Sequence, residues 1–148
     1  MGFKYQITLF LVCLLVAANV SALGQRLTGI VVIGNDIGSK SLSEQQVIEA
    51  FKAKNNFWPN GKTLSVCLPE TQSKDAPTVC KGIYGKSVSE VQKFWLSQVF
   101  QGRSRAPHFF DSDADMINYV SRTPGAIGAF VNEGNISIPT ELLIQINP

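Results

Sequence analysis

The stretch Ser112–Phe130, SDADMINYVSRTPGAIGAF, places a helix directly before a strand and decides the fold class. Acidic residues from Asp111 onwards favour a helix start, because carboxylates interact well with the amino end of a helix. The apolar side of this helix is formed by Met116, Ile117 and Val120. A Pro-Gly pair at positions 124–125 ends the helix, and Ala126–Val131 is a compact apolar strand. The stretch therefore predicts an α/β protein.

The residues before this stretch alternate between strand and helix patterns. Leu27–Ile33 is rich in β-branched residues and predicts a buried strand, and Thr63–Leu68 predicts a second strand. Between them, Ser41 and Glu44 have the spacing of a capping box, which marks a helix start. The apolar face of that helix consists of Val47, Ile48 and Phe51. Phe57–Gly61, FWPNG, predicts a turn held by two aromatic anchors.

Two more helices are expected in the middle of the chain. A short helix lies around Thr78–Tyr84, and Ser87 with Glu90 forms a second capping box before a longer one. The apolar face of the longer helix consists of Val88, Val91, Trp95 and Val99. Near the end, Ile136–Ile146 predicts one or two strands. The order of strands and helices predicts a single α/β domain with a mixed sheet.

Composition limits the function classes. The chain has 148 residues, of which 45% are hydrophobic, and it carries 13 Lys plus Arg against 11 Asp plus Glu. That apolar fraction excludes a disordered protein, and a net charge of +2 lacks the basic excess of a nucleic-acid binder. The length suffices for one domain with a core of its own.

Residues 1–22 have the pattern of a secretory signal peptide. Lys4 supplies the positive start, Ile7–Ala18 is the apolar region, and Val20 and Ala22 occupy the usual cleavage positions. We expect cleavage before Leu23, which leaves residues 23–148 as one exported, periplasmic domain; a retained membrane anchor is the alternative. No later segment approaches the length of a spanning helix.

Two cysteines remain after cleavage, Cys67 and Cys80. In an oxidising compartment, an even pair in a small domain predicts a disulfide. It would close a loop of about 14 residues and stabilise the fold by roughly 3 kcal/mol. Two free thiols or a metal site are the alternatives. A zinc site needs further ligands, and His108 is the only histidine.

Several sequence pieces, taken in order, carry a family resemblance. They are SLSEQQVIEAF (Ser41–Phe51), FWPNG (Phe57–Gly61), KFWLSQVFQG (Lys93–Gly102), the Ala-Pro pair at 106–107 and the stretch Ser112–Phe130. Together they resemble the small, exported relatives of the phosphate-binding proteins of ABC importers. The resemblance implies a type 2 periplasmic-binding fold. Full-length members have two lobes, and this chain is long enough for one lobe, a three-layer arrangement with a mixed β-sheet.

The resemblance also implies where an oxyanion would bind. The family presents an Arg at a strand end, followed by a Ser-Gly-Thr turn at a helix start. Here Leu68 occupies the Arg position and the Ser-Gly-Thr turn is absent. Hydroxyl groups and one charge remain available from Thr71, Ser73 and Lys74. Ser41 and Ser43 are anion-facing candidates at another helix start, or simply helix caps.

Two function classes follow from these residues. The first is a non-enzymatic module that binds phosphate or a related oxyanion without a cofactor. The second is a single-lobe interaction protein that has lost ligand binding and uses its open face against a protein partner or a second copy. Arg103 and Arg105 either attract an anion or belong to a solvated loop. His108 lacks an identifiable nucleophile and is expected to be structural.

Overall fold

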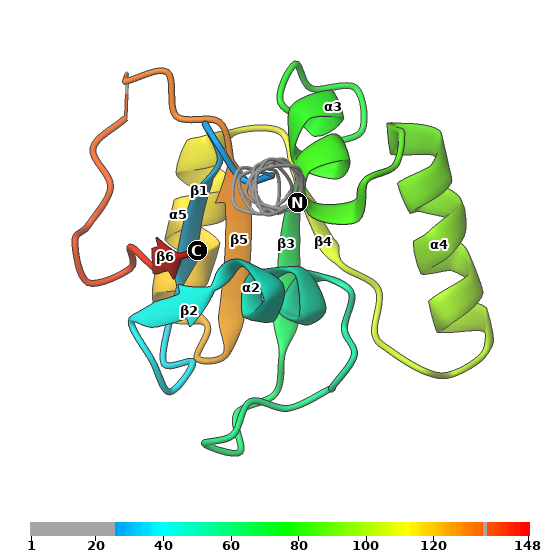
Figure 1. Cartoon of the computed structure of the whole chain (residues 1–148), viewed down its shortest axis with the longest axis horizontal. Coiled ribbons are helices and arrows are strands. Elements are labelled where there is room, and N and C mark those ends of the chain that lie inside the picture. The colour runs from blue at the N-terminus through cyan, green and yellow to red at the C-terminus, as the bar shows by residue number, and fades with distance from the viewer. Residues whose placement is uncertain (1–25, 135) are drawn as a thin grey trace, which may run out of the picture.

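The computed structural model describes residues 26–134 and 136–148. The predicted signal peptide, residues 1–22, lies outside these ranges. Among the described residues, no helix has both the length and the apolar character needed to cross a membrane. Figure 1 shows a central sheet with helices on both of its faces. The predicted mixed α/β architecture with a mixed sheet is confirmed.

The main sheet has four strands in the order β1-β5-β3-β4. They are β1 (Val31–Gly34), β3 (Ser65–Pro69), β4 (His108–Phe110) and β5 (Ala126–Phe130). Strand β3 lies parallel to both of its neighbours, whereas β1 is antiparallel to β5. Strands β3, β4 and β5 therefore begin at the same edge of the sheet. The sequence patterns had indicated β1, β3 and β5, and the short edge strand β4 was not anticipated.

Helices cover the two faces of the sheet unequally. One face carries α2 (Glu44–Phe51), α3 (Ala76–Val79) with its π-helical continuation η1 (Cys80–Tyr84), and α4 (Val88–Phe100). The other face carries α5 (Asp113–Arg122), whose residues Met116 and Val120 are fully buried. Figure 1 shows α2 in front of the sheet, α5 behind it and α4 at the side of the molecule.

A second, two-stranded sheet changes one helix boundary. Strands β2 (Ser41–Ser43) and β6 (Gln145–Asn147) pair in parallel. The expected cap at Ser41 is wrong, because Ser41 belongs to β2. The capping box is formed by Ser43 and Gln46: the Gln46 N–H donates to the Ser43 hydroxyl at 3.1 Å, and the Ser43 N–H donates to the Gln46 side chain. The expected strand over Ile136–Ile146 shrinks to β6 and one isolated bridge at Leu143.

The predicted disulfide between Cys67 and Cys80 is not formed. Both residues are free, buried thiols. Side chains alternate along a strand, so Cys67 points toward α5 while its neighbours Val66 and Leu68 point to the opposite face. Cys80 belongs to the cluster on that opposite face. The sheet itself separates the two sulfur atoms, which sequence spacing does not reveal.

Candidate functional site

The residues predicted to bind an anion are already engaged locally. The Ser41 hydroxyl accepts a hydrogen bond from Asn147, and the Ser43 hydroxyl caps α2. Thr71 donates to Glu70, and the Ser73 hydroxyl accepts from the Ala76 N–H. Only Thr71 uses its hydroxyl proton in these contacts, whereas the three serine hydroxyls accept and keep a proton to donate. The structure also does not bring them together, because two lie in or beside β2 and the others lie between β3 and α3.

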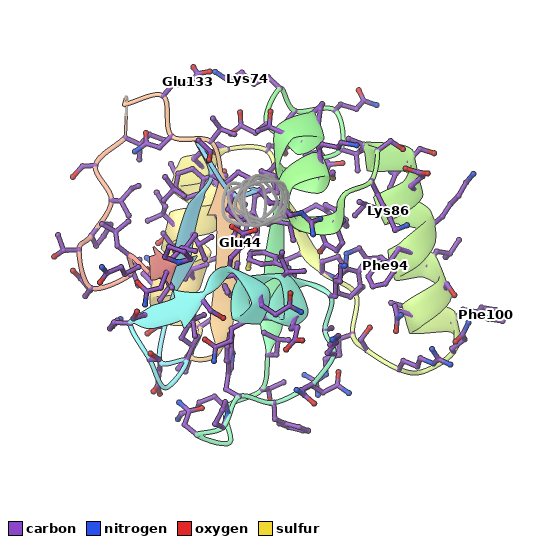
Figure 2. The ribbon with its side chains drawn as sticks, viewed as in Figure 1. Glu44, Lys74, Lys86, Phe94, Phe100 and Glu133 are labelled. Carbon is purple, nitrogen blue, oxygen red and sulfur yellow. The ribbon has the colours of Figure 1, made fainter. Side chains whose placement is uncertain are left out.

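Lys74, the one cation among these residues, is paired with an acid. Its ammonium group lies 2.6 Å from the Glu133 carboxylate, and this hydrogen bond raises the pKa of Lys74. Figure 2 shows the two side chains meeting at one end of the molecule. Buried Asp75 lies next to Lys74 and accepts the Val131 N–H at 3.1 Å. Partial burial, followed by repulsion from Asp75, raises the pKa of Asp113. The carboxyl edge of the sheet is therefore acidic and disfavours an anion.

A different site lies at the opposite edge, where β3 and β4 begin. Here the end of α5 and the loop after α4 enclose a cavity of about 190 Å³, which we call the polar pocket. Its polar side chains are Asn56, Thr63, Ser65, Ser104, Arg105, His108, Tyr119 and Thr123. The lining contains one guanidinium and one imidazole but no carboxylate. This composition is suited to a small anion.

Hydrogen bonds organise one wall of the polar pocket. The Tyr119 hydroxyl lies 3.0 Å from His108 Nε2 and 3.4 Å from the Ser65 hydroxyl. The rings of His108 and Tyr119 also pack with their centroids 4.7 Å apart. His108 reaches this wall because it is the first residue of β4, and Tyr119 because it lies on the sheet-facing side of α5. The imidazole is therefore held against the Tyr119 hydroxyl.

The lining also includes a serine whose buried hydroxyl has no partner among the described residues. Ser104 Oγ is buried and has no hydrogen-bond partner among the described residues. Its loop is fixed nearby, because Asn56 donates to the Arg103 carbonyl at 3.0 Å. Leaving a buried hydroxyl unpaired costs about 1–3 kcal/mol, so such a group calls for an explanation. Ser104 is also a lining residue of the polar pocket.

A larger cavity, of about 520 Å³, lies between α2 and the turn at residues 55–60. It is mostly apolar, with Trp58 and Phe57 on its wall. Trp58 is anchored as expected, since its indole N–H donates to the Gly125 carbonyl at 2.9 Å. Phe57 was expected to be a second anchor, but 63% of its side chain is exposed. The only charged residue of the lining is Glu49, so this cavity does not suit an anion.

Sequence analysis identified the basic loop with Arg103 and Arg105 but not the polar pocket. The missed residues are Ser65, Ser104, Tyr119 and Thr123. They lie in three separate segments, namely β3, the loop after α4, and α5 with its C-cap, which only the folded sheet brings together. The single local signal was the Arg-Ser-Arg sequence before His108. No group of three or more His, Cys, Asp or Glu side chains in the described ranges is placed to hold a metal ion.

Comparisons with known proteins give one solved structure to report. No protein-family model matches the sequence, and no curated protein matches it. The chain is similar to an ABC-type phosphate transport receptor from Vibrio cholerae, with 14% sequence identity and a TM-score of 0.49. The similarity covers 80% of this chain and 46% of the receptor chain, so the chain spans about half the receptor's length.

Proposed function

We propose that the chain is an exported, non-enzymatic binding module that takes a small oxyanion, such as phosphate, in the polar pocket. The observation that carries the proposal is the lining itself. Arg105 and several hydroxyl groups converge without any carboxylate, and Ser104 Oγ has no partner among the described residues. Hydroxyl donors and a guanidinium are the groups that proteins use to hold phosphate and sulfate.

Two further points support the oxyanion as ligand class. The family resemblance of the sequence points to phosphate-binding proteins, although the polar pocket lies at the sheet edge opposite to Thr71, Ser73 and Lys74. The acidic surroundings of Lys74 make that other edge the weaker choice for an anion.

The test is thermal unfolding of the purified protein with and without phosphate or sulfate. At a concentration 100 times the dissociation constant, binding stabilises the fold by about 2.7 kcal/mol, which is a shift of several degrees. We expect Arg105→Gln to remove the shift. Ser104→Ala should weaken it while making the unliganded protein more stable, because the lost hydroxyl was buried without a partner among the described residues.

Lys74→Gln is the matched control, since Lys74 lies outside the polar pocket and should leave the shift unchanged. Absence of a shift with both anions would overturn the proposal. A shift that survives Arg105→Gln but disappears in Lys74→Gln would move the site to the carboxyl edge of the sheet.

A second candidate is an interaction module that works without a small ligand. The observation in its favour is the exposure of three large apolar side chains on α4: Leu96, Val99 and Phe100. In this case the partner surface, and not the polar pocket, would carry the function.

A further inference from the structure

Helix α4 has two apolar faces, and packing against η1 buries only one of them. Val91 and Trp95 are each 3% exposed and fix the inner face. Leu96 is 70% exposed and Phe100 is 90% exposed, with Val99 between them. These three residues lie at i, i+3 and i+4, so they share one side of the helix. We call this side the outer face of α4.

The fold does not require the outer face. Trp95 donates from its indole N–H to the Tyr84 hydroxyl at 3.2 Å, which attaches α4 to the core from the inside. Figure 2 shows Phe94 directed toward the body of the molecule and Phe100 directed away from it. Single exposed apolar residues are ordinary, but a contiguous group on one helix face marks an interaction surface.

The charged side chains beside the outer face are basic, apart from Glu90, which is engaged with Ser87 in the capping box at the start of α4. Residues 91–110, VQKFWLSQVFQGRSRAPHFF, contain Lys93, Arg103 and Arg105 but no Asp or Glu. Lys93 precedes Leu96 by one helical turn and therefore lies on the same side of α4. Arg103 lies in an exposed loop three residues after Phe100. The Cα atoms of the two residues can therefore be at most about 11 Å apart. Basic groups thus flank the apolar residues at both ends.

We propose that the outer face of α4 docks on an anionic lipid surface. Phe100, Leu96 and Val99 would enter the boundary between headgroups and acyl chains, and Lys93 and Arg103 would contact headgroup phosphates. A helix that combines Phe and Leu with flanking Lys and Arg is the usual form of an interfacial anchor. The inference names a partner for the second candidate function and is independent of the polar pocket.

Charge and shape favour lipid over other occupants. In a dimer through this face, Lys93 and Arg103 would approach the basic side chains of the second copy, and the one carboxylate of α4, that of Glu90, is already engaged with Ser87. A protein partner would need a complementary pocket for a ring that is 90% exposed. A lipid surface accepts a protruding ring without such a pocket.

The experiment is sedimentation of the purified protein with vesicles of phosphatidylcholine mixed with an equal amount of phosphatidylglycerol. Pure phosphatidylcholine vesicles serve as the neutral arm. We expect binding to the mixed vesicles that weakens with salt. The double variant Leu96→Ser, Phe100→Ser should bind at least about tenfold more weakly, from the apolar surface it no longer buries. The double variant Lys93→Gln, Arg103→Gln should bind more weakly and lose much of the salt dependence.

Phe57→Ser is the matched control, because Phe57 is another exposed phenylalanine far along the chain from α4. It should leave vesicle binding unchanged. Thermal unfolding checks that each variant is folded. Absence of binding to mixed vesicles would overturn the proposal, as would equal losses in Phe57→Ser and the Leu96, Phe100 double variant. Light scattering that shows a dimer, dispersed by that double variant, would assign the face to a second copy. Phosphate-induced stabilisation, measured separately, should persist in the Lys93, Arg103 variant.

Discussion

Gly125→Ala should be among the most damaging single substitutions in this protein. Gly125 has a φ of +87°, and a Cβ placed there would lie 2.1 Å from the Thr63 carbonyl oxygen. Ordinary contact is above 3.4 Å, so the backbone itself would have to move by more than an ångström. The left-handed conformation costs a further 1–2 kcal/mol, roughly, for a residue with a Cβ.

Such a movement would break hydrogen bonds that meet at Gly125. Its N–H donates to the Asn35 carbonyl at 2.7 Å, and its carbonyl accepts from the Ser65 N–H and from the Trp58 indole. At about 1 kcal/mol each, two lost bonds together with the conformational cost give a total of about 3–4 kcal/mol. This is a large fraction of the stability of a small domain.

The assay is urea unfolding followed by tryptophan fluorescence, with Gly61→Ala as the matched control. Gly61 has a φ of +83° but no heavy atom within 4 Å of its Cβ position, so only the conformational cost of about 1 kcal/mol applies. Asn tolerates this conformation, so Gly61→Asn should be nearly neutral and Gly125→Asn still severe. Equal costs at the two positions would refute the reasoning, because the clash would then contribute nothing.

Three further predictions concern the core, the thiols and a helix cap. Tyr84→Phe should cost about 2 kcal/mol in urea unfolding, because it leaves the Phe51 carbonyl and the Trp95 indole N–H without their buried partner. Burial raises the pKa of Cys67 to about 12 and that of Cys80 to about 11, so neither thiol should react with iodoacetamide in the native protein near pH 8. Both thiols should react in denaturant without added reductant. An intact mass lower than that of the reduced chain by two hydrogens would reveal a disulfide and contradict this. The hydrogen bond from the Ser87 N–H lowers the pKa of the Glu90 carboxyl group below its ordinary value of 4.5. The stability that this carboxylate contributes is therefore present above the ordinary pKa and is lost as the pH falls through the lower pKa of the folded state. In Glu90→Gln, the free energy of unfolding should therefore fall less between neutral pH and about pH 3 than in the original protein. An equal fall in both proteins would count against the capping contact.

Local sequence patterns correctly predicted the helices and strands that neighbouring residues determine. The capping box of Ser87 and Glu90 starts α4 as expected, and Met116 and Val120 are buried as the helical spacing indicated. The Pro-Gly turn leads into β5, as the stretch Ser112–Phe130 predicts.

The incorrect predictions concern features that are determined by residues far apart in the sequence. SLSEQQ contains two overlapping capping patterns, and pairing of β2 with β6 selects Ser43 over Ser41. Cys67 and Cys80 are close in sequence, but strand alternation turns Cys67 to the other face of the sheet. The polar pocket combines segments separated by about half the chain, and only the order of strands in the sheet brings them together.

The pairing of β2 with β6 also constrains how the protein is made. Ser41 receives its hydrogen bond from Asn147, 106 positions later in the chain. During synthesis, the segment before α2 must wait until residues 145–147 have emerged before it can take its final place. A nascent chain that lacks them presents an open strand edge beside α2. The small sheet is therefore a late-forming part of the fold, completed only after the elements that pair within residues 31–130.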